Sequence, residues 1–564
     1  MNRNNERHFA NIPQVHISRS TFNRPQNILT TFNAGELVPF YVDEVLPGDT
    51  FRVRTSAIIR QSTPKYPVMD DAYIDMYYFF VPNRIVWDNF KYFMGEVEDT
   101  PWMPTKEYQI PQIQIKGTNS HKTPDTGTIL DYMGVPTKCV GDGAEMEINS
   151  LPIRGYVKIW NEFFRDQNVD NAAKIRTTDQ GTVYGTGSES GNETHVTVEE
   201  RLQNAYKGGF CLPVNKFHDY FTSCLPYPQR GPEVNLPMTG NAPVGMFHDS
   251  NLTNSFDESK KIYLNGDGEG TPIAQLWPNN KGGKTTLLDG ATANKGNVNS
   301  GAYLGADLSK VNAATINDLR QAIAVQHYYE AMARGGSRYR EQVRSIYGVT
   351  ISDKTVQVPE YLGGGRYHVN MNQIIQTSAA NNETNTPLGE TGAVSITPIN
   401  ETSFTKSFEE HGYVIGVMCV RHDRSYQQGL EKFWSRRDRL DIYVPQFANL
   451  GEQPVKKREI MATGTATDEE TFGYQEAWAD YRYKPNRVSG KMRSNAEGTL
   501  DFWHYADNYS TVPTLSQEWM KEGRAEIART LIVQDEPQFF GAIRVDNKTT
   551  RPMPLYSVPG LDKI

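Results

Sequence analysis

Two stretches of this sequence combine positive charges with aromatic rings, and they are its best candidates for chemistry. Cationic side chains neutralise phosphates and aromatic rings stack on bases, so this combination suits a protein that binds single-stranded nucleic acid without strict sequence preference. The same residue types also form salt bridges between subunits, and the sequence leaves that alternative open. The first stretch contains Arg334, Arg338, Tyr339, Arg340, Arg344 and Tyr347, and the second contains Tyr481, Arg482, Tyr483, Lys484, Arg487, Lys491 and Arg493.

A third basic region is the N-terminal segment, residues 1–34. Its four arginines, Arg3, Arg7, Arg19 and Arg24, face a single carboxylate, Glu6. The segment shows little hydrophobic periodicity, so we expect an extended arm. Such an arm either lies along a neighbouring chain or a polyanion, or is a disordered tail. Its arginines join the residues above as candidate nucleic-acid contacts.

Other motifs that suggest chemistry are incomplete. Gly283-Lys284-Thr285 resembles the end of a phosphate-binding loop, but Pro278 occupies the position of the first glycine. Residues 265–276 resemble a calcium loop, but Leu276 replaces the final bidentate carboxylate. The 11 histidines lack the spacing of a zinc site. The sequence therefore predicts no metal, cofactor or catalytic residue, although the fold, not the sequence, places the paired carboxylates of a glycosidase.

The composition narrows the class of protein. The chain has 564 residues and a net charge of −8, so it cannot coat nucleic acid by bulk charge alone. It contains no apolar run long enough to span a membrane and no apolar core of a secretory signal near its start. Its 46 glycines and 32 prolines are typical of a turn-rich β protein. The four cysteines, Cys139, Cys211, Cys224 and Cys419, show no CxxC spacing, so we expect reduced thiols.

The elements that would position these residues are mostly strands, and they cluster at the two ends of the chain. Phe51 to Ile59 alternates apolar and polar side chains, which predicts a half-buried strand. Tyr73 to Val81 is apolar almost throughout, which predicts a strand covered on both faces. Further strands are expected at residues 413–420, 440–444, 455–461, 531–533 and 539–545.

The middle of the chain supplies helices and loops. Apolar spacing predicts short helices over residues 85–95 and 156–164, and a longer one from Thr315 to Arg334, ended by Gly335-Gly336. Residues 231–312 hold 12 glycines and 11 asparagines, too polar a stretch to bury a core, so we expect a surface excursion. One sandwich built from both ends of the chain, over residues 35–564 with this insertion, fits the pattern better than a string of domains.

Several long blocks resemble the major capsid proteins of microviruses, in particular the gokushovirus branch. They occur in the family's order from near residue 20 to the C-terminus, so the resemblance covers almost the whole chain. The blocks are residues 32–50 (FNAGELVPFYVDEVLPGDT), 223–232 (SCLPYPQRGP), 334–339 (RGGSRY), 447–453 (FANLGEQ) and 474–485 (YQEAWADYRYKP).

The resemblance implies a mainly β fold, an eight-stranded antiparallel jelly roll of the viral capsid type with large loop and helical insertions. It implies a homo-oligomeric T=1 icosahedral shell around a circular single-stranded DNA genome, and no enzymatic site. The implied partners are a small basic DNA-packaging protein, an internal scaffolding protein and a bacterial surface receptor. The implied place is the virion, assembled in the cytoplasm of a bacterial host. In this family an insertion builds surface protrusions that meet the host, and residues 231–312 occupy the corresponding position.

One alternative from another class remains at this point. A jelly-roll protein that binds carbohydrate or acts on glycosides would share the fold. A secretory signal or an aromatic platform with paired carboxylates would favour it, and the sequence shows neither. If the chain forms a shell, its net charge of −8 requires cations or a basic protein to neutralise the DNA, and we expect the arm and the basic stretches to face inward.

Overall fold

The computed structural model describes residues 18–97, 106–117, 121–187, 193, 196–234, 244–248, 274–278, 285–289, 302–306, 315–377, 389, 391–534 and 536–557. The chain divides into two compact units. The first contains Met1–Pro228 and Met332–Ile564, and the second contains Gln229–Ala331. Arg3 and Arg7 of the expected arm lie outside the described residues.

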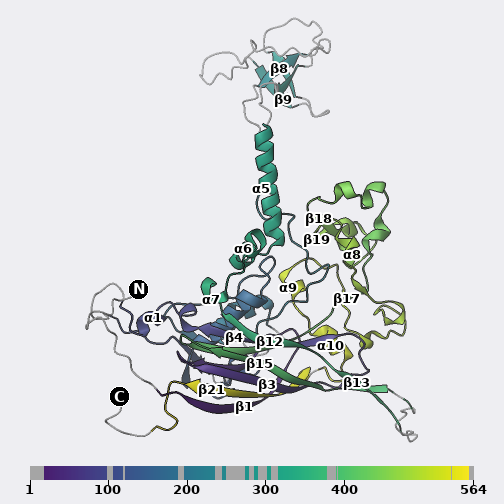
Figure 1. The fold of residues 1–564 in the computed structure, drawn as a ribbon. Coiled ribbons are helices and arrows are strands. Elements are labelled where there is room, and N and C mark those ends of the chain that lie inside the picture. The colour runs from purple at the N-terminus through teal and green to yellow at the C-terminus, as the bar shows by residue number, and fades with distance from the viewer. Residues whose placement is uncertain are drawn as a thin grey trace. The chain divides into compact units, whose positions relative to one another are not determined.

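The centre of the first unit is a pair of four-stranded antiparallel sheets (Figure 1). The structure is therefore mainly β, as predicted. The first sheet has the order β1 (Ser20–Phe32), β21 (Phe539–Arg551), β3 (Thr50–Gln61) and β15 (Thr397–Ser407). The second has the order β12 (Glu360–His368), β4 (Ala72–Pro82), β16 (Gly412–His422) and β2 (Val38–Val45).

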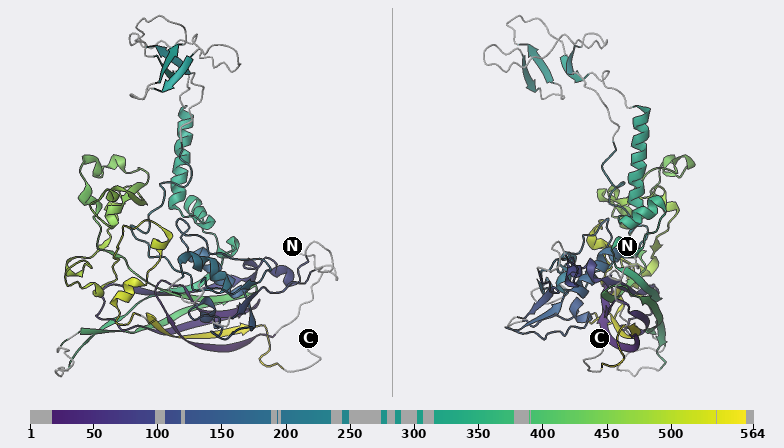
Figure 2. Two further views of the ribbon diagram at one scale, coloured as in Figure 1. Left: turned by 180° about the vertical axis from the view of Figure 1, so that it is seen from behind. Right: turned by 60° about the vertical axis from the view of Figure 1, so that its left-hand side comes forward.

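The two sheets share one core. Every second side chain of β3, from Phe51 to Ile59, is buried, which confirms the predicted alternation. These side chains pack with Phe539, Ile543 and other apolar residues of the neighbouring strands. Strands from opposite ends of the sequence lie side by side, as the purple and yellow ribbons of Figure 2 show.

The second sheet is covered on both faces. Its strand β16 has the buried pattern expected of a fully enclosed strand, and β4 nearly so. The outer layer is formed by residues from the 83–214 region, chiefly α3 (Leu151–Ile159) and the π-helix η3 (Trp160–Phe164). Tyr156 fixes this layer, because its hydroxyl donates a 2.6 Å hydrogen bond to the carbonyl of Leu37. The helix predicted over residues 156–164 is confirmed, and Tyr156, Ile159 and Trp160 are buried in the core.

The structure corrects several sequence expectations. Residues 20–32 are not a free arm, since they form β1 and pair with β21 along its whole length, from Ser20–Arg551 to Phe32–Phe539. The strand expected at 440–444 is wrong, because the short helix η8 (Arg439–Asp441) begins there and the apolar side chains are exposed. The strand expected at 531–533 is also wrong: of these residues only Leu531 makes a bridge, to Pro64.

Two further expectations are half correct. The strand predicted at 455–461 covers the end of β18 (Gln453–Lys456), after which α8 (Lys457–Ile460) begins, and the Lys456 N–H donates a 2.9 Å hydrogen bond to the Glu459 carboxylate. The helix predicted at 85–95 is split into η2 (Asn83–Ile85) and α1 (Phe90–Phe93).

The remaining elements of the first unit are β5 (Gln112–Lys116), α2 (Ile129–Tyr132), β6 (Glu145–Asn149), β7 (Thr182–Val183), α4 (Val198–Asn204), η5 (Ala205–Lys207), α6 (Tyr339–Tyr347), α7 (Asp353–Val356), β13 (Met371–Ile375), β14 (Thr391–Ser395), β17 (Ser425–Tyr426), η7 (Lys432–Ser435), η9 (Pro445–Phe447), η10 (Ala466–Glu469), β19 (Thr471–Gln475), η11 (Ala479–Tyr481), β20 (Asn486–Arg487), η12 (Gly490–Met492), η13 (Asp501–Trp503), α9 (Gln517–Met520) and α10 (Ala525–Thr530).

The second unit contains two antiparallel pairs of short strands. Strand β8 (Val244–His248) pairs with β11 (Ala302–Ala306), and β9 (Ala274–Pro278) pairs with β10 (Thr285–Asp289). Most other residues of the expected 231–312 excursion lie outside the described residues. Helix α5 (Ile316–Arg334) follows, as predicted, and Thr315 caps it, since the Thr315 hydroxyl accepts a 3.1 Å hydrogen bond from the N–H of Asp318. No residue of α5 is buried in the described structure, so its apolar face is not a core face here.

Candidate nucleic-acid interface

The second basic-aromatic stretch is held in place by a small core of its own. Tyr220, Phe221, Tyr426 and Phe472 pack together in this core. Strand β20 pairs in parallel with β17, which fixes Arg487 beside Tyr426. The stretch is therefore part of a packed subdomain rather than a loose loop.

Side chains from residues 481–493 line a cavity of about 540 Å³. Four of the aromatic rings that line it, those of Phe433, Trp434, Tyr481 and Tyr483, are at least two-fifths exposed. The ring centres of Phe433 and Trp434 are 4.7 Å apart, so they form one apolar surface. The cations that line the cavity are Lys432, Arg436, Lys484, Arg487 and Arg493, and the carboxylates are Glu431, Glu459 and Asp480.

Most of these cations already have a carboxylate partner. Glu431 pairs with Lys484 at 2.5 Å and with Arg487 at 3.4 Å. Arg482 pairs with Glu476. Lys484 and Arg487 nevertheless remain 67% and 73% exposed, and exposed pairs are worth only about 0–1 kcal/mol, so a phosphate can replace the carboxylate.

Two further cations at this cavity were missed from the sequence. Lys432 and Arg436 lie about fifty residues before the predicted stretch, and both interact with Asp480. The guanidinium of Arg436 also lies 4.2 Å from the ring centre of Tyr481. Both residues stand in the run Lys432-Phe433-Trp434-Ser435-Arg436-Arg437, so a basic-aromatic signal was present in the sequence and was overlooked.

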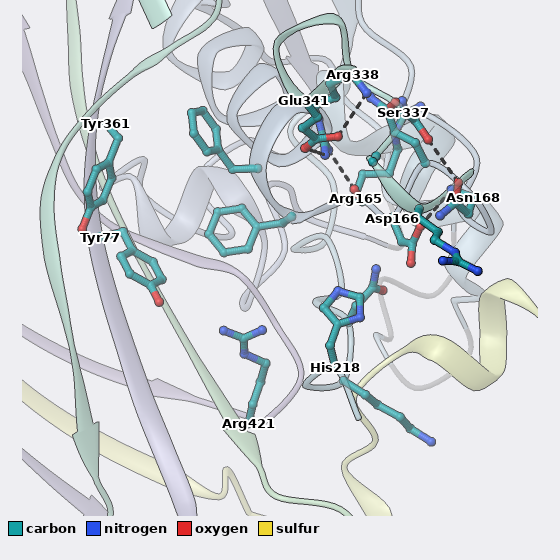
Figure 3. Close-up of a pocket in the computed structure, with 18 of the residues that line it drawn as sticks. Tyr77, Arg165, Asp166, Asn168, His218, Ser337, Arg338, Glu341, Tyr361 and Arg421 are labelled. Carbon is teal, nitrogen blue, oxygen red and sulfur yellow. Dashed lines mark hydrogen bonds and ion pairs between the residues drawn. The ribbon is translucent and has the colours of Figure 1, made fainter. Parts of the chain in front are cut away.

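The first basic-aromatic stretch lies elsewhere, at a pocket of about 620 Å³ (Figure 3). Arg338 is bound to Glu341 at 3.1 Å and donates to the carbonyl of Arg165 at 2.8 Å. Arg340 pairs with Asp353 at 2.8 Å and lies 4.7 Å from the ring centre of Phe163. Both arginines thus attach α6 to the η3 region, which is the role of a structural cation.

The pocket of Figure 3 brings aromatic and charged side chains to opposite walls. Tyr77 and Tyr361 stand on one side, and Arg165, Arg338 and Glu341 on the other. Burial and the neighbouring Arg338 lower the pKa of Arg165. The cations of the two predicted stretches do not converge on one site, since none of the predicted cations that line this pocket also lines the cavity at 481–493.

The remaining candidates differ in their surroundings. Arg344, Lys491 and Arg493 are exposed and form no ion pair with a described residue. Arg24 pairs with Asp43, and Arg19 is exposed just before β1.

The structure also exposes basic residues that no sequence motif singled out. Arg52, Arg54 and Arg60 occupy the exposed positions of β3, next to Arg544 and Lys548 of β21. The signal was present, because arginine alternates with apolar residues in β3. Their clustering with β21 depends on strand pairing across nearly the whole chain.

Other functional features are few in the part of the chain that the structure describes. It contains no group of three or more His, Cys, Asp or Glu side chains that could hold a metal ion. All four cysteines are free, and burial raises the pKa of Cys419 to about 12, so its thiol is inert. None of the described helices is long and apolar enough to cross a membrane.

A family model described as capsid protein (F protein) matches residues 10–561. That range contains both sheets, the cavity at 481–493 and the pocket of Figure 3. The chain belongs to this capsid protein family. The predicted resemblance is thereby confirmed, and the capsid protein is a structural component of a phage virion.

Curated relatives agree over nearly the full length of this capsid protein. Capsid protein VP1 of Chlamydia phage 1 is 37% identical over 606 residues, which covers 99% of this chain and 98% of the relative. Capsid protein VP1 of Bdellovibrio phage phiMH2K is 38% identical over 574 residues, with the same coverage. Capsid protein VP1 of Spiroplasma virus 4 is 38% identical over 569 residues and covers 97% of this chain and 96% of the relative.

Proposed function

We propose that this capsid protein is the repeating subunit of a closed T=1 icosahedral shell around a circular single-stranded DNA phage genome. The observation that carries the proposal is the family match over residues 10–561, together with a complete two-sheet sandwich within that range. Shell assembly takes place in the cytoplasm of the bacterial host, and the mature particle is the virion.

The proposed subunit fold is an eight-stranded jelly roll. The support is the distribution of the strands, because the first four of the sandwich alternate between the sheets in chain order and the last three alternate again. Strands β4 and β12, which follow one another in the sandwich, pair within the second sheet. Two four-stranded antiparallel sheets linked in this way are what a double Greek key produces.

The surface of the subunit supports assembly. Stable contacts between proteins bury roughly 1,200–2,000 Å² and are centred on aromatic and apolar anchors. Several large apolar side chains are mostly exposed in the isolated chain, and a shell would cover them. They include Tyr347, Leu440 and Ile442.

The partners follow from charge and position. A net charge of −8 does not neutralise packaged DNA, so the proposal includes a small basic packaging protein in addition to the exposed cations of the shell. Among the sequence candidates, the cations near the cavity at 481–493 remain the proposed DNA contacts. An internal scaffolding protein and a bacterial surface receptor complete the set.

We place the receptor contact on the 231–312 insertion as part of this proposal. The support is that residues 229–331 form a compact unit of their own. This unit is an insertion, because the chain belongs to the first unit both before and after it. A unit of this kind can change its surface without disturbing the sandwich core.

Particle formation by the full-length chain tests the proposed function. The chain is expressed alone and with the other virion proteins of its phage, and is then separated by size and imaged by electron microscopy. We expect uniform closed particles in at least the second case. A chain that stays monomeric or trimeric in both cases contradicts the proposal.

A further inference from the structure

The outer face of the sheet β1-β21-β3-β15 is strongly basic. Its opposite face is buried in the core, and in the described residues no helix or second sheet covers the outer one (lower layer of Figure 1). The exposed positions alternate with the buried ones along β3 and β21. The cations at these positions are Arg52, Arg54, Arg60, Arg544 and Lys548.

Strand pairing brings these charges together. Lys548 lies directly opposite Arg52, and the exposed ring of Phe540 lies opposite Arg60. Residues in such positions have Cβ atoms about 4.5–5.5 Å apart, and like charges placed opposite each other destabilise a sheet. The nearest carboxylate on this face is Asp546, which lies opposite Arg54, so five cations face one described carboxylate and leave an excess positive charge that an anion from outside the sheet would compensate.

The described part of the chain does not supply that anion. Asp546 is the one carboxylate among the described exposed side chains of these four strands, and it is paired with Arg544 at 3.1 Å. Arg52, Arg54, Arg60 and Lys548 form no ion pair with any described residue. This differs from the stretch 481–493, where Glu431 and Glu476 already pair with Lys484, Arg487 and Arg482.

An apolar patch continues the basic face. Leu29, Ile58 and Phe540 are 85%, 48% and 38% exposed, and Leu29 and Ile58 both lie opposite Ala542 on the intervening strand. These three residues and Arg60 line a hollow of about 900 Å³, whose far wall contains Asp131 and Tyr132 of α2. The face thus offers cations and apolar side chains side by side.

We propose that this face binds single-stranded nucleic acid. Phosphates bind the unpaired cations of β3 and β21, and bases pack on Phe540 and Ile58. A single strand fits because its bases are unpaired and reach an apolar patch next to its own phosphates, whereas a duplex presents mainly its backbone. This inference rests on the proposed shell around single-stranded DNA and names the surface that would hold the genome.

The test compares two full-length triple variants that remove the same charge. Arg52→Gln/Arg54→Gln/Lys548→Gln changes the sheet face, and the control Lys91→Gln/Lys122→Gln/Lys138→Gln changes exposed lysines elsewhere. Binding of fluorescent poly-dT is measured against salt concentration. Since each lost phosphate contact on a single strand lowers the log–log salt slope by about 0.7, we expect the sheet variant to lose about 2 from that slope. The control variant should keep the wild-type slope.

A second measurement distinguishes specific binding of nucleic acid from binding of polyanions in general. Phe540→Ala should weaken poly-dT binding about fivefold or more, because base stacking on an aromatic side chain is lost. It should leave binding of inorganic polyphosphate unchanged. Equal weakening of both ligands, or of neither, would overturn the assignment of bases to this patch.

The remaining outcomes also decide the matter. Unchanged poly-dT binding by the sheet variant, or equal loss in both triple variants, overturns the proposal. If wild-type chains form closed particles and the sheet variant does not, the face is a contact between copies and the proposal is again overturned. Failure of the wild type to form particles contradicts the shell itself, while poly-dT binding still reports on the sheet face alone.

Discussion

At the scale of single residues, the most heavily charged part of the interior is a network around Asp507. Its carboxylate binds Arg424 at 2.6 Å and Lys216 at 3.3 Å, and the other side of Arg424 binds Glu522 at 2.6 Å. His422 completes the network with a 2.5 Å contact to Glu522. All five side chains are buried. The network ties the end of β16 to the segment 504–522.

Replacing one member of this network should be costly. Asp507→Asn leaves Lys216 buried without its counter-charge and leaves Arg424 with Glu522 alone, and breaking a buried pair in this way costs about 3–5 kcal/mol. We expect the free energy of unfolding, measured by denaturant titration, to fall by that amount. The control is Glu145→Gln, which breaks the exposed 2.7 Å pair with Lys116 and should change it by no more than about 1 kcal/mol. Equal effects would mean that the buried network carries no stability.

The same network predicts acid sensitivity. Burial alone would raise the pKa of Asp507, but Arg424 and Lys216 outweigh it and hold the pKa below its usual range. The pKa of Glu522 is likewise lowered, mainly by Arg424 against the effect of burial. A depressed carboxyl pKa stabilises the fold above the unfolded pKa of about 4, and this stability is lost as the pH falls further. The midpoint temperature of thermal unfolding of the wild type should therefore fall below about pH 4. Asp507→Asn should make that midpoint less dependent on pH.

The exposed cations near the cavity allow a different residue-scale prediction. Charge reversal by Arg482→Glu/Lys484→Glu/Arg487→Glu places three negative charges beside Glu431 and Glu476, where they would repel phosphate. We expect particles to form but to contain less DNA, as measured by absorbance ratio and by electron microscopy of filled and empty shells. Unchanged DNA content would assign this cavity a structural role.

At the scale of elements, the sequence predicted strands where burial imposes a simple pattern. The alternation of β3 and the apolar runs of β4 and β16 follow directly from one or two buried faces. Strand β1 was not predicted from the sequence because, apart from Phe32, its side chains are at least partly exposed and it contains Pro25. Its partner β21 is more than 500 residues away, so only tertiary pairing makes it a strand. The apolar run 440–444 was wrongly predicted as a strand, because its apolar side chains are exposed rather than buried.

Strand β12 depends on glycine for its close approach to β4. A Cβ atom on Gly364 would lie 2.4 Å from the carbonyl oxygen of Met76, which is backbone and cannot move aside. Gly364→Ala should therefore loosen β12 and cost about 1–3 kcal/mol of unfolding free energy. Gly392→Ala is the matched control, because its Cβ would meet only the carbonyl of Ile374 at 3.9 Å. Similar stability of the two variants would show that β12 accommodates the extra atom.

At the scale of the whole molecule, sequence adjacency was a poor guide to charge. The stretch 481–493 was found because its cations are neighbours in the chain, but Glu431, which pairs with two of them, lies far upstream. The basic sheet face shows the reverse case. Its members come from β3 and β21, separated by about 490 residues, and become one surface only through strand pairing. A cluster that is local in sequence is easily neutralised by the fold, whereas a cluster assembled by pairing cannot be recognised before the topology is known.

The same topology makes the last strand indispensable. Strand β21 lies between β1 and β3, so the first sheet cannot close until residues 539–551 are available, and Phe539, Ile543 and Val545 fill its core. Ending the chain after Gln538 removes three buried apolar side chains, worth about 1.5–3 kcal/mol each. It also leaves β1 without a hydrogen-bond partner and one edge of β3 unpaired, although β3 still pairs with β15. We expect this variant to be digested in limited proteolysis and to form no particles, while a chain ended after Arg551 assembles like the wild type. Closed particles from the shorter chain would mean that β1 and β3 can pair directly, and that the sandwich tolerates the loss of its central strand.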